Sequence, residues 1–157
     1  MKRYFLYACV FVFISGYLAC TEEKNKSAQP TERSTIAEDS TNIKIALQLF
    51  DHFNKHDWQS YASLYSDSAK FLDPSFGKNE IVQSRVQTIQ KYSELQKIIP
   101  DVNDNLRSVN VAGQNTVIVE FISTGTLPDK NKLYLPICTI LKIEGGKIIE
   151  DHTYFDN

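Results

Sequence analysis

Cysteine and net positive charge are both scarce in this sequence. Its 157 residues include three cysteines, and 17 lysines and arginines stand against 19 aspartates and glutamates, which gives a formal net charge of −2 at pH 7. A chain without a basic excess does not have the charge pattern of nucleic-acid-binding proteins, so we expect no nucleic acid partner. The sequence also has no glycine-rich phosphate loop, no nucleophile elbow and no cysteine cluster. No cofactor is signalled, and we expect none.

The first residues have the pattern of a secretory signal peptide. Met1, Lys2 and Arg3 form a short basic start, and the next 16 residues, 4–19, carry no charge. A run of this length is short for a membrane-spanning helix, which needs about 20 apolar residues. A basic start, an apolar run and a small residue before the cleavage point together predict a signal peptide over residues 1–19 that is cut before Cys20.

The residues around the predicted cleavage point, Tyr17-Leu18-Ala19-Cys20, resemble a bacterial lipoprotein signal. The resemblance implies that Cys20 is lipidated, becomes the new N-terminus and anchors the protein to a membrane of the cell envelope, facing the periplasm or the outside. The acidic run in Thr21-Glu22-Glu23 resembles the surface-export signal of some Bacteroidetes lipoproteins. Cys9 leaves with the signal peptide, so Cys138 is the remaining thiol and no intramolecular disulfide is possible.

The mature chain divides into a polar segment and a longer apolar-patterned segment. Residues 20–38 contain almost no large apolar side chain, so we predict a disordered tether that joins the lipid to a folded domain. Residues 39–157 are left for folding. About 120 residues without an internal repeat suit one domain with one core.

Apolar residues at three- and four-residue spacing predict helices in the first half of the domain. Asp39, Ser40 or Thr41 is expected to cap a first helix. The apolar side of this helix is formed by Ile43, Ala46, Leu47, Phe50 and Phe53. Asp57 is expected to cap a short second helix, and a third helix is predicted from about Asn79 to Tyr92.

The rest of the domain has strand and turn patterns. Segments rich in β-branched and aromatic residues predict strands over residues 69–72, 106–111, 116–126, 132–144 and 147–155. Gly145-Gly146 is a two-residue hairpin signal, because a type I′ turn needs positive φ at both central positions. Helices grouped before antiparallel strands predict an α+β fold in which the helices cover one face of a curved sheet.

The order and spacing of several short motifs resemble the SnoaL-like branch of the nuclear transport factor 2-like superfamily. These motifs are Leu49-Phe50, Asp57-Trp58, residues 64–69, Asp73-Pro74, Pro100-Asp101, residues 146–150 and Tyr154-Phe155-Asp156. The resemblance implies a cone, in which a strongly bent antiparallel sheet wraps around three N-terminal helices as a cystatin-like α+β roll. It implies a pocket in the open end of the cone. Domains of this kind often form homodimers through the outer face of the sheet.

Asp73 is the first catalytic candidate. It precedes Pro74 at the end of a predicted strand, where the resemblance to ketosteroid isomerases of the same superfamily implies a general base. A carboxylate at the end of a buried strand would have a raised pKa and could move protons at neutral pH. The alternative is that Asp-Pro is ordinary turn chemistry. The isomerases also carry an oxyanion-donating Tyr where this chain has Leu49-Phe50.

The last predicted strand holds the second catalytic candidate. Similar polyketide cyclases end in a His-Trp-Asp-like run whose Asp is the acid or base, and Thr153 stands at the matching position. Strand alternation places Asp151 on the face of Thr153 and Phe155, so Asp151 is a candidate to replace that carboxylate. Thr153 and Phe155 are candidate ligand contacts. A one-residue bulge would turn the opposite face, with His152 and Tyr154, toward the pocket, so both faces remain open.

Four further residues are candidates for ligand binding. Trp58, Tyr61 and Phe121 are suited to the wall of an apolar pocket, although a helix-on-sheet core would use the first two in the same way. Glu120 lies on an apparently apolar strand face. It is either a polar group of the pocket or part of a dimer interface.

His52 and His56 have the i, i+4 spacing of a metal-binding pair on a helix. No third ligand is signalled nearby. A solvated face near the helix C-terminus, where a protonated His interacts favourably with the helix dipole, explains both residues, and we predict no metal site.

Three hypotheses for function follow. In the first, a lipid-anchored SnoaL-like domain binds a small, mostly apolar molecule in the cone pocket without turnover. In the second, the domain is a homodimeric protein-interaction module. In the third, it is a cofactor-independent isomerase, cyclase or dehydratase with Asp73 as general base.

Overall fold

The computed structural model describes residues 30–156. The predicted signal peptide, Cys20 and the first part of the predicted tether lie outside the described residues. Within the described part of the chain, no helix is both long enough and apolar enough to cross a membrane.

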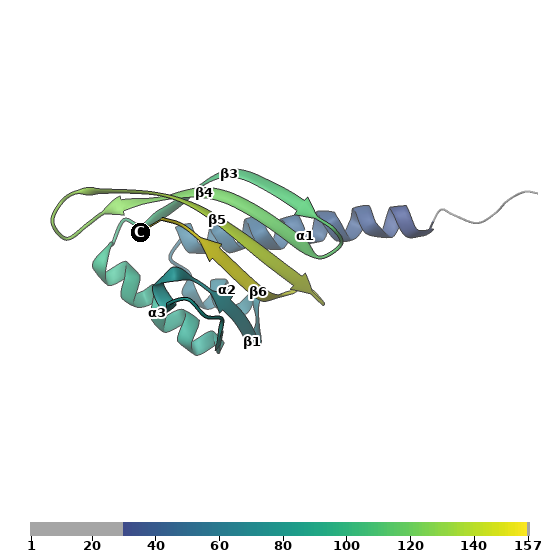
Figure 1. The fold of residues 1–157 in the computed structure, drawn as a ribbon, viewed down its shortest axis with the longest axis horizontal. Coiled ribbons are helices and arrows are strands. Elements are labelled where there is room, and N and C mark those ends of the chain that lie inside the picture. Colours follow the sequence, from purple (N-terminus) through teal and green to yellow (C-terminus); the bar gives the residue numbers. More distant parts are fainter. Residues whose placement is uncertain (1–29, 157) are drawn as a thin grey trace, which may run out of the picture.

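Six strands form one curved sheet in the order β2-β1-β6-β5-β4-β3, and the sheet bends over the helices (Figure 1). The strands are β1 (Tyr65–Leu72), β2 (Ile81–Gln83), β3 (Asn103–Ala112), β4 (Thr116–Thr126), β5 (Lys132–Glu144) and β6 (Lys147–Tyr154). The helices are α1 (Pro30–Asn54), α2 (Trp58–Ser63) and α3 (Arg85–Ile98), and a short 3₁₀ turn, Pro74–Phe76, follows β1. This arrangement confirms the predicted α+β fold with a bent sheet and N-terminal helices.

Strands β3 to β6 form an antiparallel meander, and β6 pairs in parallel with β1. The parallel pairing joins β1 and β2, from the first half of the domain, to the meander. Strands β4 and β5 have the predicted bounds. Gly145 and Gly146 have φ of 56° and 74°, which confirms the predicted hairpin turn with positive φ at both positions.

Helix α1 begins earlier than the sequence pattern suggested. It starts at Pro30, so the last part of the segment predicted to be disordered, residues 30–38, is helical. Proline is favoured at a first helical position because its missing N–H has no partner to lose there. The prediction relied on the apolar stripe, which starts later, since a polar helical segment has no such signal. Figure 1 shows this end of α1 extending past the sheet.

Helix α3 also differs from its prediction, because it begins at Arg85 and not near Asn79. Ile81–Gln83 form the edge strand β2. Ser84 is the N-cap, and its side chain and that of Gln87 satisfy each other's backbone N–H groups as a capping box. The spacing of Ile81 and Val82 relative to later apolar residues suggested that both belong to the helix. In the structure the N-cap follows them, so the helix begins only after these two residues.

The core lies between α1 and the concave face of the sheet. The buried side of α1 is formed by Ile45, Ala46, Leu49, Phe50 and Phe53, whereas Leu47 of the predicted stripe is 43% exposed. From the sheet, this core receives Val117, Val119, Leu141, Ile143 and Ile148. The rings of Phe50 and Phe121 meet edge to face, with centroids 4.8 Å apart, so α1 is fixed directly against β4.

Candidate functional site

A partly open cavity of about 560 Å³ lies between the helices and the concave face of the sheet. Its walls are mainly apolar and include Leu49, Phe50, Phe53, Leu95, Ile99, Val102, Phe121, Leu133, Leu135 and Ile137. Cavities of several hundred Å³ with apolar walls and a few placed polar groups are typical of small-molecule sites. The polar groups of this cavity belong to three clusters, which differ in how far their hydrogen bonds are satisfied.

A bulge in β6 decides which residues of the last strand reach the cavity. Lys142 of β5 pairs with Glu150, and the next residue, Ile143, pairs with Ile148, so Ile149 is the extra residue. The bulge lets Ile148 in the core and Asp151 at the cavity lie on the same side of the sheet. Of the two faces that the sequence left open, the one with Asp151, Thr153 and Phe155 lines the cavity.

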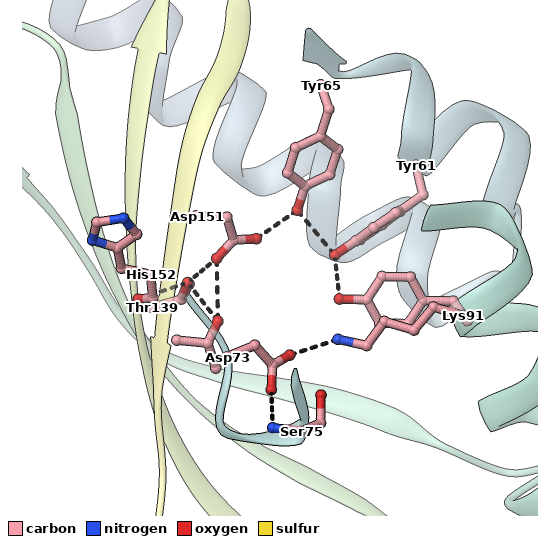
Figure 2. A network of polar contacts seen from close by, with 10 residues as sticks. Tyr61, Tyr65, Asp73, Ser75, Lys91, Thr139, Asp151 and His152 are labelled. Atoms are coloured by element: carbon pink, nitrogen blue, oxygen red, sulfur yellow. Dashed lines mark hydrogen bonds and ion pairs between the residues drawn. The ribbon is translucent and has the colours of Figure 1, made fainter. Parts of the chain in front are cut away.

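Asp151 is the centre of the first polar cluster (Figure 2). Tyr65 Oη donates to its Oδ2 over 2.7 Å, and Thr139 Oγ1 and Thr153 Oγ1 donate to its Oδ1 over 2.6 and 3.1 Å. The residue is buried. Three hydroxyl donors compensate a buried carboxylate for the hydrogen bonds to water that it has lost.

A row of three tyrosine hydroxyls extends from Asp151. Tyr61 Oη lies 3.1 Å from Tyr65 Oη and 3.1 Å from Tyr92 Oη, with a hydrogen bond at each contact. Burial, together with the charge of Asp151, raises the pKa of all three phenols well above the usual value. The tyrosines therefore stay neutral across the physiological range. They join α2, β1 and α3 to the last strand.

Asp73 and Lys91 form the second cluster, which lies beside the first in Figure 2. Lys91 Nζ is 2.5 Å from Asp73 Oδ2, and the Ser75 backbone N–H donates to Oδ1 over 2.8 Å. Burial alone would raise the pKa of Asp73, but the charge and hydrogen bond of Lys91 and the bonds from Ser75 outweigh it and lower this pKa. The sequence suggested a raised pKa, and the structure corrects this because Lys91 supplies a counter-charge from α3.

Asp104 is the third polar group, and the sequence analysis did not single it out. It is 7% exposed and lines the cavity, and its Oδ1 has no hydrogen-bond partner. Burial raises the pKa of Asp104 to about 7, partly offset by the neighbouring Ser123 side chain. Asp104 faces inward because of a bulge at Arg107. Without that bulge, strict alternation back from the inward-facing Val109 would place Asp104 on the outer face of the sheet.

Two predicted ligand-binding residues lie elsewhere. Trp58 is buried in the core, where its indole N–H donates to Gln96 Oε1 over 2.7 Å and its ring stacks on Tyr92. Glu120 is exposed on the outer face of the sheet, where its carboxylate accepts a hydrogen bond from Ser108 over 2.7 Å. Tyr61 and Phe121, by contrast, line the cavity.

Of the two candidate histidine ligands, His56 is engaged by hydrogen bonds, whereas His52 Nδ1 has no hydrogen-bond partner. His56 Nε2 lies 2.9 Å from the Val102 carbonyl oxygen, and its Nδ1 lies 2.9 Å from Gln96 Nε2. His52 Nδ1 lies 3.9 Å from Asp57. Among the described residues, no group of three or more His, Cys, Asp or Glu side chains is placed to hold a metal ion.

The chain belongs to the family of SnoaL-like domains, whose family model matches residues 46–151. A comparison with curated proteins found no match. The fold is shared with many solved structures. One is a hypothetical protein with a ketosteroid isomerase-like fold from Catenulispora acidiphila, in complex with trimethylamine, at 17% identity and a TM-score of 0.63 over 71% of this chain and 85% of that one.

Two further solved structures have the same fold at similar levels of sequence identity. A putative polyketide cyclase from Streptomyces antibioticus is 18% identical, with a TM-score of 0.65 over 74% of this chain and 92% of that one. An epoxide hydrolase from M. tuberculosis is 14% identical, with a TM-score of 0.64 over 76% of this chain and 85% of that one. These identities establish a common fold and leave the chemistry of this chain to be argued from its own residues.

Proposed function

We propose that this SnoaL-like domain binds a small, mostly apolar molecule in the cone cavity and does not turn it over. The observation that carries the proposal is the cavity of about 560 Å³ between the helices and the sheet, with its apolar walls. A space of this size matches small-molecule sites and would hold an apolar body against Phe121, Leu135 and Ile137. The solved structures named above include proteins described as a putative polyketide cyclase, an epoxide hydrolase and a hypothetical protein in complex with trimethylamine.

The state of the two predicted catalytic carboxylates supports binding without turnover. Asp73 is neutralised by Lys91, and its pKa is lowered, so it is a weaker base than a free carboxylate. Asp151 already accepts three hydroxyl hydrogen bonds, so both of its oxygens are engaged within the protein. An isomerase, cyclase or dehydratase using Asp73 as general base therefore has less support than a binding protein.

Native mass spectrometry of the protein, purified gently from its own host, tests the proposal. We expect a co-purifying small molecule. Leu135→Trp should lose this molecule, because the larger side chain takes up space in the cavity. Tyr134→Trp is the matched control, because Tyr134 is the neighbouring residue on β5 and is 66% exposed. An empty cavity in the unmodified protein that also takes up no added apolar probe would contradict the proposal.

A homodimer through the outer face of the sheet is the second candidate function. Tyr134 and Tyr154 are 66% and 48% exposed on β5 and β6. They line a shallow groove with Pro136, Cys138 and Glu120. Exposed aromatic residues on the same face of a sheet favour association. Glu120 would then belong to the interface.

Sedimentation equilibrium tests the dimer. We expect a concentration-dependent dimer that Tyr134→Glu converts to a monomer. Val86→Glu is the control, because Val86 is 73% exposed on α3 and lies away from the sheet. A protein that stays monomeric at high concentration would exclude this function.

The sequence also leads us to propose that Cys20 is lipidated and anchors the domain to a membrane of the cell envelope. The support is the signal-like pattern of residues 1–19 and the position of Cys20 after Ala19. Metabolic labelling with a radioactive fatty acid should mark the unmodified protein and not Cys20→Ala. Labelling of both forms, or of neither, would contradict the anchor without affecting the proposed ligand site.

A further inference from the structure

Asp104 is held firmly by its backbone, while one oxygen of its carboxylate has no hydrogen-bond partner. The Asp104 N–H donates to Asn54 Oδ1 over 2.7 Å, and Asn54 Nδ2 donates to the Asp104 carbonyl oxygen over 2.9 Å. This two-way contact ties β3 to the end of α1. The side chain is 93% buried, lines the cavity and has an Oδ1 atom without a hydrogen-bond partner. Buried polar groups are nearly always hydrogen-bonded, so an unpartnered carboxylate oxygen requires an explanation.

The other charged groups of the cavity are already engaged. Asp73 pairs with Lys91, and Asp151 accepts from three hydroxyls. Glu94 is exposed and accepts from Gln90 on its own helix over 3.0 Å. The titratable groups lining the cavity are the carboxyls of Asp73, Glu94, Asp104 and Asp151, the ammonium of Lys91 and the phenols of Tyr61 and Tyr92. Four carboxyls against one ammonium make the cavity a poor site for an organic acid.

We propose that Asp104 is the anchor for the basic nitrogen of a ligand whose apolar body fills the cavity, so that the ligand is an organic amine. The inference rests on the proposed binding function and names the ligand class for the same site. An ammonium group supplies the missing donors to Oδ1 and the missing counter-charge. Charge pairing in an apolar surrounding is much stronger than in water, so this one contact would select amines over neutral molecules of the same shape.

The position of Asp104 also orients the ligand. Asp104 is on β3 and Asp151 on β6, and these strands are three steps apart in the sheet. At about 4.8 Å per step, the two strands are roughly 14 Å apart across the sheet. Asp104 is in register with Leu135 of β5 through Ser123, and Asp151 is in register with Leu141, six residues further along β5, which adds an offset of roughly 20 Å along the strand. Ser123 lies opposite Asp104 in the register. Phe121 and Ile137 pair with each other on β4 and β5, between the strands that carry the two carboxylates. The nitrogen would sit at the β3 side, with the apolar body directed toward β5 and β6.

Three naphthalene probes of nearly equal size separate the charge effect from simple apolar binding. They are 1-naphthylmethylamine, which is a cation, 1-ethylnaphthalene, which is its neutral isostere, and 1-naphthoate, which is an anion. Binding to the purified protein is measured by calorimetry or naphthalene fluorescence at pH 8. We expect the amine to bind at least about tenfold more tightly than 1-ethylnaphthalene, and the anion to bind most weakly.

Asp104→Asn should bring the amine to the affinity of 1-ethylnaphthalene and leave 1-ethylnaphthalene unchanged. Glu120→Gln is the matched control, because it removes a carboxylate from the outer face, and it should change neither affinity. Equal binding of the amine and 1-ethylnaphthalene to the unmodified protein would overturn the amine inference and leave the proposed binding function standing. Binding of no probe would overturn both.

A second measurement needs no variant and keeps the inference testable if Asp104→Asn does not fold. In protein carrying ¹³C-labelled aspartate carboxyls, the Asp104 signal should titrate at lower pH in the presence of the amine, and 1-ethylnaphthalene should not lower it. The ring of His56, which contacts the Val102 carbonyl, and the cavity groups named above are the other titrating neighbours. An Asp104 signal whose titration does not change when the amine is added would contradict the proposed role of Asp104.

Discussion

The three aspartates of the cavity differ in the number of hydrogen-bond donors that their carboxylates have. Asp151 has three hydroxyl donors, Asp73 has an ammonium and a backbone N–H, and Asp104 has an oxygen without a partner. A satisfied buried carboxylate strengthens the fold, and an unsatisfied one weakens it. The three aspartates should therefore respond differently to substitution.

Tyr65→Phe should destabilise the fold, because it removes one of the three donors to Asp151 and a hydrogen-bonding neighbour of Tyr61. We expect a loss of about 1–3 kcal/mol in the free energy of unfolding, measured by urea denaturation. Tyr154→Phe is the control, because Tyr154 is 48% exposed, and it should stay within about 0.5 kcal/mol of the unmodified protein. Equal effects of the two substitutions would show that the contact with Asp151 does not stabilise the fold.

Asp104 should make the free energy of unfolding fall as the pH rises. The pKa of its carboxyl is raised from 3.8 to about 7 in the folded protein, so between these values the folded state holds a proton that the unfolded state has lost. The stability present below roughly pH 4 is lost progressively up to roughly pH 7, by at most on the order of 4 kcal/mol.

Asp104→Asn removes this titration. Relative to the unmodified protein without ligand, the variant should therefore become more stable as the pH rises from roughly 4 to 8, in urea denaturation at each pH. The other titrating groups are shared by both proteins and cancel in the difference. A stability difference that is constant with pH would contradict the buried, unpartnered state of this carboxyl.

At the level of elements, two bulges and one close contact shape the site. The bulges at Ile149 in β6 and Arg107 in β3 turn Asp151 and Asp104 inward. The contact is at Gly125 of β4, where the segment after α3 crosses the sheet. A Cβ at this position would lie 2.4 Å from Ile99 Cγ2 and 3.4 Å from Val102 Cα. Glycine is needed here because the backbone of β4 and the Ile99 side chain touch.

Gly125→Ala should therefore cost about 1–3 kcal/mol of stability by overpacking, in urea denaturation. In an Ile99→Ala background the added methyl group has room, so the same substitution should cost clearly less. The double-mutant cycle measures this difference directly. Additive effects of the two substitutions would show that the contact with Ile99 does not limit the size of residue 125.

At the scale of the whole molecule, the feature to be tested is the residue at which the folded domain begins. Helix α1 starts at Pro30, and Figure 1 shows its first turns beyond the sheet, whereas Asn42 and Ile45 further along it are buried. We propose that residues 39–157 contain the complete folding unit. The helical segment 30–38 would then act as an extension of α1.

A chain that starts at Asp39 should keep the stability of a chain that starts at Pro30 within about 0.5 kcal/mol, because this part of α1 extends past the sheet in Figure 1. Thermal and urea unfolding of the two chains measure the difference. A third chain that starts at Leu47 is the control, and it should be strongly destabilised because it lacks Ile45 and Ala46 of the core. A loss of more than about 1 kcal/mol on removing residues 30–38 would place the domain boundary earlier.

The sequence by itself determined the class of fold and the elements whose signals are local. Alternation and turn residues defined β4, β5 and the Gly145-Gly146 turn, and the capping position of Asp57 defined the start of α2. These signals arise within a few residues, so a single sequence contains them. The same alternation placed Asp151, Thr153 and Phe155 on one face, but it left open which face of the strand lines the cavity.

Only the tertiary structure decided how the polar residues are paired. Lys91 reaches Asp73 from another element, 18 residues along the chain, and Tyr65 reaches Asp151 across 86 residues. The contact of Tyr65 with Asp151 depends on the parallel pairing of β1 with β6, which no local pattern signals. The bulge in β3 turned Asp104 toward the cavity, and a one-residue shift of this kind reverses every side chain beyond it. The cavity and its unpartnered carboxylate therefore follow from the assembled sheet.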